Sequence, residues 1–166
     1  PSKIMTKKAF ENAVIVASAI GGSSNATTHL LAIAKHMGIK FDLSNWQKLG
    51  HKIPLLVDCQ PAGKYLMEGF YKAGGIPAVM KELIKNKKLN TKVKTVTGKN
   101  LGQNLKRKIK VNSKVIKTFK KNLSKNAGFL VLRGNFFNSA IMKTSVISDE
   151  FKKRYLSERD RPNSFI

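Results

Sequence analysis

Two adjacent glycines followed by three small polar residues form the stretch of the sequence best suited to chemistry. Gly21 and Gly22 lack a Cβ, so the backbone there can approach a partner closely. Ser23, Ser24 and Asn25 stand where a helix is predicted to begin, and the free N–H groups and dipole of such an end favour an anion. The stretch therefore predicts either a carboxylate or phosphate site or an ordinary turn with a helix cap. No Gly-Lys-Ser/Thr follows, so it is not a phosphate-binding P-loop.

Other side chains with ligating or catalytic potential are scattered along the chain. Lys64 is expected at the start of a helix over residues 61–70, where a cation is electrostatically unfavourable, so it either serves a ligand or is a solvated lysine. The three histidines form no metal-ligand cluster by spacing, and the serines lack a nearby base. We therefore predict no catalytic residue and no metal ligand within this chain.

The single cysteine, Cys59, excludes an internal disulfide and a cysteine cage for a metal. It is expected to act as a small, half-buried hydrophobic residue, and a lone cysteine fits the reducing cytoplasm. No run of about 18 uninterrupted apolar residues occurs, so we expect no membrane-spanning segment. Neither end of the chain has the layout of a natural terminus, and we therefore expect an internal piece of a longer protein.

The positive charge is concentrated in one block. The chain has 32 Lys and Arg residues against 9 Asp and Glu, a net charge of +23, and 16 of the basic residues fall within residues 81–125. Such a block can bind nucleic acid, an anionic membrane surface or an acidic partner. However, only 5 of the 32 are arginine, the residue that base-specific readers favour. We favour a solvated lysine-rich surface, with no specific binding of nucleic acid and no membrane association.

Apolar spacing predicts helices through about residue 88. A first helix capped by Thr6 should end at the two glycines, a second should end at Gly38, and a third should start at residues 42–44 and carry Trp46. Residues 53–57 could be a buried strand, and Pro77 should lie in the first turn of a helix after Gly74 and Gly75.

The second half of the chain predicts less regular structure, followed by strands. Residues 93–96 suggest an extended piece, and 101–105 a short helix. Residues 106–125 are read as an exposed connector or weak strands. Residues 129–132, 140–142 and 146–147 are expected strands, and a short helix is expected over residues 151–156. We predict an α/β class, which becomes α+β for the fragment taken by itself. The expected domain boundaries give a helical part over residues 1–90, a connector over 91–126 and a β-rich part over 127–166. We expect little contact between the two outer parts.

Several long motifs together resemble one enzyme family. Residues 21–34 (GGSSNATTHLLAIA), 61–68 (PAGKYLME), 73–83 (AGGIPAVMKEL) and 95–99 (TVTGK) are similar to ordered motifs of the dihydroxy-acid and phosphogluconate dehydratases. Ser24 stands where the family pattern usually has Thr. Residues 128–135 (GFLVLRGN) and 139–148 (SAIMKTSVIS) resemble the sugar-acid branch, such as the arabinonate and xylonate dehydratases.

The resemblance implies a hydro-lyase that removes water from a 2,3-dihydroxy acid or sugar acid and gives a 2-keto-3-deoxy acid. It implies an iron–sulfur cluster and a magnesium ion in the family, and this chain alone is expected to bind neither. It also implies that the family's enzymes are homo-oligomers. It places the chain at the end of an N-terminal α/β domain and the start of a β-rich C-terminal domain. The alternatives are a basic nucleic-acid-binding protein and a non-catalytic subunit that completes another chain.

The resemblance and the local chemistry together select six residues that are expected to bind substrate. Ser23, Ser24 and Asn25 come first, as anion-binding groups at the start of a helix. Lys64 is a second candidate, as a cation for the same anion, and Lys143 and Thr144 follow because they match the sugar-acid branch. The chain is expected to be inactive by itself, because the family's cluster cysteines and catalytic serine do not occur in it.

Overall fold

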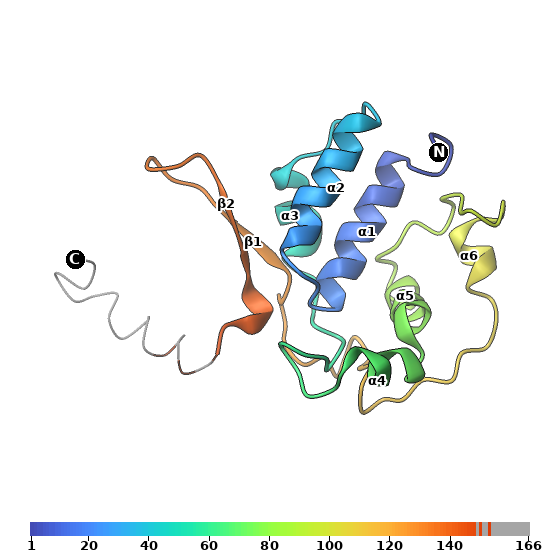
Figure 1. Cartoon of the computed structure of the whole chain (residues 1–166). Coiled ribbons are helices and arrows are strands. Elements are labelled where there is room, and N and C mark those ends of the chain that lie inside the picture. Colours follow the sequence, from blue (N-terminus) through green and yellow to red (C-terminus); the bar gives the residue numbers. More distant parts are fainter. Residues whose placement is uncertain (149, 151–152, 154–166) are drawn as a thin grey trace.

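The computed structural model describes residues 1–148, 150 and 153, and shows a helical body with a protruding hairpin (Figure 1). The helices are α1 (Lys7–Ala19), α2 (Asn25–His36), α3 (Leu43–Gly50), α4 (Met67–Lys72), α5 (Gly75–Lys85) and α6 (Leu101–Asn104). The strands β1 (Phe129–Leu132) and β2 (Ala140–Lys143) pair antiparallel, and the 3-10 turn η1 (Thr144–Val146) follows. This mixture of helices and a small sheet agrees with the predicted class. The division into domains stays a prediction.

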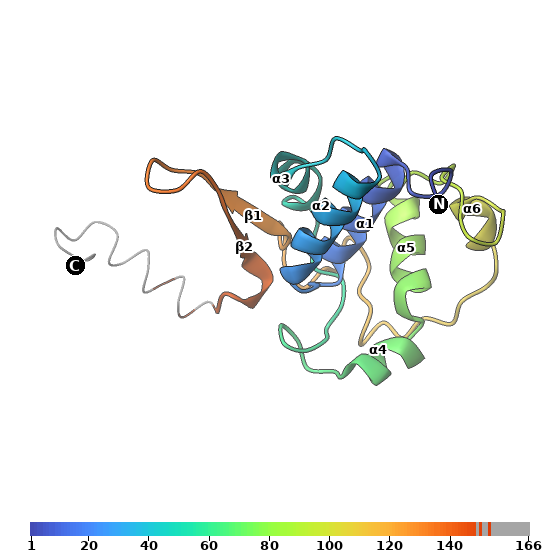
Figure 2. The same ribbon diagram turned by 45° about the horizontal axis from the view of Figure 1, so that its top comes forward.

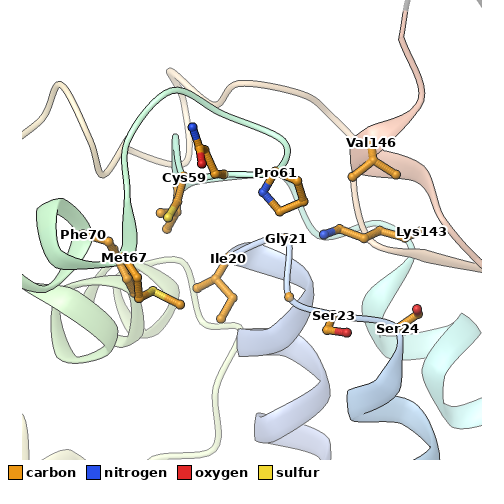
Figure 3. Close-up of a pocket in the computed structure, with 13 residues that line it drawn as sticks. Ile20, Gly21, Ser23, Ser24, Cys59, Pro61, Met67, Phe70, Lys143 and Val146 are labelled. Carbon is orange, nitrogen blue, oxygen red and sulfur yellow. The ribbon is translucent and has the colours of Figure 1, made fainter.

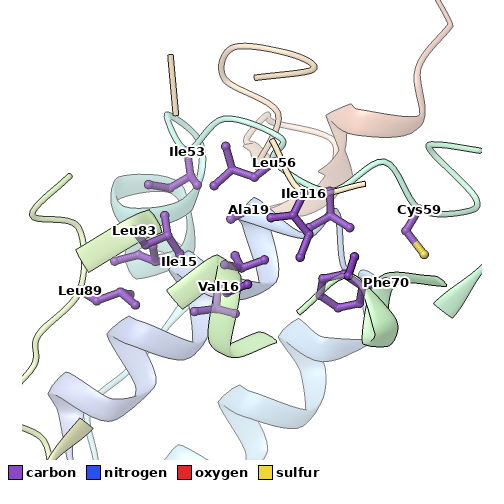
Figure 4. Packing of buried hydrophobic residues seen from close by; sticks show 14 of the residues in the cluster. Ile15, Val16, Ala19, Ile53, Leu56, Cys59, Phe70, Leu83, Leu89 and Ile116 are labelled. Carbon is purple, nitrogen blue, oxygen red and sulfur yellow. The ribbon is translucent and has the colours of Figure 1, made fainter. Parts of the chain in front are cut away.

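Helix α1 is the central element, because it contributes to both hydrophobic clusters of the body. Its Ile15, Val16 and Ala19 pack with α5 and with residues 53–57 (Figure 4). On another face, Phe10 and Val14 join Trp46 of α3 and Phe129 of β1. Val14 and Ala19 are completely buried, so α1 has little surface left on these faces. The predicted helix between Thr6 and the two glycines is therefore confirmed.

The hairpin is docked firmly on α3. The Trp46 and Phe129 rings meet edge to face with their centroids 4.9 Å apart. The Val131 N–H donates to Oε1 of Gln47 over 2.7 Å. A Cβ built on Gly128 would lie 1.9 Å from the carbonyl oxygen of Gly50, so only glycine allows this approach of two backbones. The prediction of little contact between the first and last parts of the chain is wrong, because these apolar and polar surfaces complement each other.

The lysine-rich stretch is not simply exposed. Val115 and Ile116 are 2% and 3% exposed and join the main cluster, while their lysine neighbours stay on the surface. The Asp58 N–H donates to the Val115 carbonyl over 2.9 Å, and the Lys117 N–H donates to the Leu56 carbonyl over 2.7 Å. Of the two alternatives predicted for this stretch, the exposed connector does not describe Val115 and Ile116, and the isolated bridges of Ile116 and Ser124 are closer to the weak strands.

Three further local predictions differ from the structure. Residues 53–57 are buried and extended, but they form only isolated bridges, Leu55 to Ser124 and Val57 to Ile116, so they are not a regular strand. The helix expected over residues 61–70 begins only at Met67, because the preceding residues turn back. Hydrogen bonds from the Lys64 and Tyr65 N–H groups to Asp58 close that turn. The helix expected over residues 151–156 lies outside the described residues.

We predict that Gly128→Ala lowers the free energy of unfolding by about 1–3 kcal/mol, because the new methyl group would meet the Gly50 carbonyl oxygen. Gly134→Ala is the matched control, since a Cβ there meets nothing within 4 Å. Urea unfolding followed by the fluorescence of the single tryptophan, Trp46, measures both variants. Equal stabilities for the two variants would show that the hairpin is not docked as described.

Candidate functional site

A cavity of about 470 Å³ lies where three distant parts of the chain meet (Figure 3). The first part is the turn between α1 and α2, the second runs from residue 57 into α4, and the third is the end of β2 with η1. The lining residues are Ile20, Gly21, Gly22, Ser23, Ser24, Val57, Cys59, Gln60, Pro61, Met67, Phe70, Lys143 and Val146. No carboxylate is among these described lining residues, so the site suits an anion with an apolar part.

The turn between α1 and α2 depends on Gly21. Its φ of +65° lies in the left-handed region that favours glycine. A Cβ at this position would lie 2.9 Å from Cδ1 of Leu55 and 3.5 Å from Oγ of Ser145. The close approach expected at the glycines is therefore made to other parts of this same chain. It brings η1 and residues 53–57 together against the end of α1.

The three polar residues after the glycines do not all face the cavity. Ser23 and Ser24 line it, whereas Asn25 does not. Ser24 is the N-cap residue of α2, yet its side chain makes no cap hydrogen bond. The Ser23 hydroxyl accepts a hydrogen bond from the Asn25 N–H over 3.2 Å. All three side chains are exposed, so the two serine hydroxyls are accessible to a ligand.

Lys143 brings a cation to the same cavity from the far end of the chain. It is the last residue of β2, and its side chain extends toward Gly21 and Pro61 (Figure 3). Desolvation by partial burial lowers the pKa of its ammonium group below the ordinary value. An anionic ligand beside it would favour the charged form and oppose this effect.

Thr144 and Lys64 do not line the cavity. The Thr144 hydroxyl donates a hydrogen bond to the carbonyl oxygen of Gly128, with the Asn126 carbonyl oxygen 3.4 Å away, and so fixes the end of the hairpin. Lys64 is exposed, and its backbone N–H donates to Oδ1 of Asp58 over 2.8 Å. It does not stand at the start of a helix, because α4 begins three residues later.

Several residues near the cavity were missed by the sequence reasoning. Cys59, Gln60 and Pro61 line it from the segment just before the Lys64 turn, and Cys59 is 8% exposed. The Ser145 hydroxyl is buried without a hydrogen-bond partner among the described residues, next to Gly21. No local pattern marks these residues. The one available signal was that Pro61 and Ser145 fall inside motifs that carry the family resemblance.

The residues present do not fit the cofactors that the resemblance implies. An iron–sulfur cluster is held by several thiolates, and this chain has one cysteine. Over residues 1–148, 150 and 153, no three His, Cys, Asp or Glu side chains are grouped so that they could hold a metal ion. Two hydroxyls and an ammonium group can bind and orient a carboxylate, but they do not themselves form an acid–base pair. None of the helices in the described part of the chain has the length and apolar character needed to cross a bilayer.

Comparison with known proteins finds the same enzyme family by a family model and by individual relatives. Residues 1–104 match the model of the dihydroxy-acid/6-phosphogluconate dehydratase N-terminal family. The chain is 47% identical over 165 residues to D-xylonate dehydratase of Caulobacter vibrioides, covering 99% of this chain and 28% of that protein. It is 44% identical over 149 residues to L-arabinonate dehydratase of Rhizobium leguminosarum bv. trifolii, covering 89% and 26%.

A third relative comes from the other branch of these enzymes. Dihydroxy-acid dehydratase of Flavobacterium psychrophilum is 50% identical over 101 residues, which cover 61% of this chain and 18% of that protein. The chain thus spans about a quarter of the length of the sugar-acid relatives and less of this one. The match to the family model, over residues 1–104, covers most of the chain and includes the turn between α1 and α2. The chain belongs to the dihydroxy-acid/6-phosphogluconate dehydratase family.

Proposed function

We propose that this chain forms one wall of the active site of a dehydratase that converts a sugar acid to a 2-keto-3-deoxy acid. The observation that carries the proposal is the meeting of Ser23, Ser24 and Lys143 at one cavity whose described lining residues include no carboxylate. The identity to a D-xylonate dehydratase over nearly the whole chain supports the sugar-acid branch over the dihydroxy-acid branch.

The role proposed for this wall is to bind the carboxylate end of the substrate. Lys143 supplies the positive charge, and the Ser23 and Ser24 hydroxyls supply hydrogen bonds that fix the orientation. The dipole at the start of α2 adds a positive potential on the same side. Asn25, Lys64 and Thr144 remain weaker candidates, because they do not line the cavity. The proton transfers and the loss of the hydroxyl group are assigned to no residue of this chain.

The remaining features of the family are proposals for this protein as well. The cluster and the magnesium ion would be bound by residues other than those described, and they would supply Lewis acidity when bound. We propose a cytoplasmic enzyme that works as a homo-oligomer. The alternative is that this chain is a separate subunit that completes another chain. In that case the same cavity would bind the substrate carboxylate.

We predict that the isolated chain takes up no iron–sulfur cluster and has no dehydratase activity, because it contains a single, buried cysteine. Anaerobic reconstitution with iron and sulfide, followed by visible absorbance and a 2-keto-acid assay with D-xylonate, tests this. Stoichiometric cluster absorbance, or turnover above that of a chain-free blank, would overturn the prediction.

A chimera tests the carboxylate-binding role. The segment of Caulobacter D-xylonate dehydratase that aligns with residues 1–148 is replaced by those residues, and the chimera is expected to keep activity. Lys143→Met in the chimera should then raise KM for D-xylonate by roughly 10-fold to 100-fold, the loss expected for a hydrogen bond to a charged group.

Lys35→Met is the control, because it removes the same charge from an exposed position of α2 outside the cavity. It should leave KM for D-xylonate within about twofold of the value for the unsubstituted chimera, as surface substitutions usually have small effects. A Lys143→Met chimera that folds and has the same KM as the Lys35→Met chimera would refute the proposed role of Lys143.

A further inference from the structure

A second cationic site lies near the opposite end of α1. Residues Lys3, Thr6, Lys7, Lys8, Asn90, Lys92, Val93 and Lys94 line a groove of about 530 Å³, which we call the lysine groove. In Figures 1 and 2 the N-terminal segment lies beside the loop that leads to α6. Five of the eight lining residues are lysines, and none of these described lining residues is acidic.

The arrangement is imposed by contacts that do not involve the lysines' charges. Asn12 is 5% exposed, and its side-chain amide donates to the Asn90 carbonyl over 2.9 Å. Its Oδ1 accepts from the Asn90 N–H over 2.8 Å. Leu89 is buried and Val93 packs on the same cluster, so the segment is held on both sides of this pair of hydrogen bonds. Lys92 and Lys94 therefore remain beside α1 despite charge repulsion.

The other wall of the groove is equally fixed. The Ile4 and Met5 N–H groups donate to the Pro1 carbonyl over 2.9 and 2.8 Å, and Met5 packs on the Trp46 cluster. Lys7 and Lys8 occupy the first turn of α1, which has no acidic residue, and the Thr6 side chain makes no cap hydrogen bond. The positive end of the helix dipole thus adds to the field of the five lysines.

Acidic side chains do not neutralise this groove within the part of the chain that the structure describes. Glu11 is the nearest acid along α1, one turn from Lys7, but it does not line the groove and forms no ion pair there. The ion pair that does form among the described residues, between Lys72 and Glu68, lies on α4. Because like charges held together raise the energy of the folded state, an anion in the groove would stabilise it.

We propose that the lysine groove binds a compact anion that carries several phosphate groups. Lysines supply point charges that suit phosphates, and several of them favour a ligand with several negative charges. Among its described lining residues, the groove has no aromatic side chain on which a nucleobase could stack and no arginine fork for base edges. An oligophosphate chain therefore fits the groove better than a nucleic acid does. The proposal is independent of the dehydratase function, because the groove and the cavity share no residue.

Calorimetric titration of the full chain at about 50 mM salt, where screening is weak, tests the proposal. Inorganic tripolyphosphate should bind with one-to-one stoichiometry and much more tightly than orthophosphate. It should also raise the melting temperature. The double variant Lys7→Ala/Lys92→Ala should weaken tripolyphosphate binding by at least roughly tenfold, since it removes one cation from each wall.

The double variant Lys120→Ala/Lys121→Ala is the charge-matched control, because both lysines are exposed and lie outside the groove. It should change the affinity by no more than about twofold, because neither lysine lines the groove where the ligand would be held. Equal weakening in the two double variants would contradict the proposal and indicate a diffuse lysine surface. A DNA duplex that binds more tightly than tripolyphosphate would also overturn it. Circular dichroism and urea unfolding confirm that each variant is folded before titration.

Discussion

The close approach of Gly128 to Gly50 is the constraint on which the rest of the structure depends. A Cβ on Gly50 would lie 2.6 Å from Oγ of Ser18, and one on Gly128 would lie 1.9 Å from the Gly50 carbonyl oxygen. The end of α3 therefore packs directly against the Ser18 and Val14 side chains of α1, and the chain before β1 packs backbone to backbone on Gly50. The Trp46–Phe129 contact closes the same interface. This stacking carries β2 past the body, so that Lys143 reaches the cavity near Gly21.

The two cationic sites lie near opposite ends of α1, in different electrostatic environments. The cavity is beside the C-terminal end, where the helix dipole is negative and favours a nearby cation such as Lys143. The lysine groove is at the N-terminal end, where the dipole is positive and adds to the field of the lysines. The cavity thus holds a single, partly desolvated positive charge, that of Lys143, and its lining also includes the Ser23 and Ser24 hydroxyls. The lysine groove is a concentration of solvated charges, which suits a ligand with a much higher charge.

The sequence predicted the features that local patterns determine. The cap position of Thr6, the glycine turn after α1 and the place of Pro77 in the first turn of α5 are as predicted, although α5 already begins at Gly75 and not after it. The joining of Ser23 and Ser24 with Lys143 could not be derived from spacing, because it depends on packing between segments far apart in the chain. The burial of Val115 and Ile116 was hidden by the surrounding lysines. Lys64 was wrongly predicted to lie at the start of a helix. The turn that Asp58 closes occupies this part of the chain, so α4 begins only at Met67.

The central claim is that the end of the hairpin lies against the glycine turn and so completes the cavity. A nuclear Overhauser experiment on isotopically labelled protein tests it most directly, because a Cβ built on Gly21 would lie 4.0 Å from Cβ of Ser145. The account predicts a cross-peak between the Gly21 Hα protons and the Ser145 Hβ protons. It also predicts cross-peaks between the Trp46 and Phe129 rings. The absence of the Gly21–Ser145 cross-peak in a spectrum that contains the ring contacts would contradict the account.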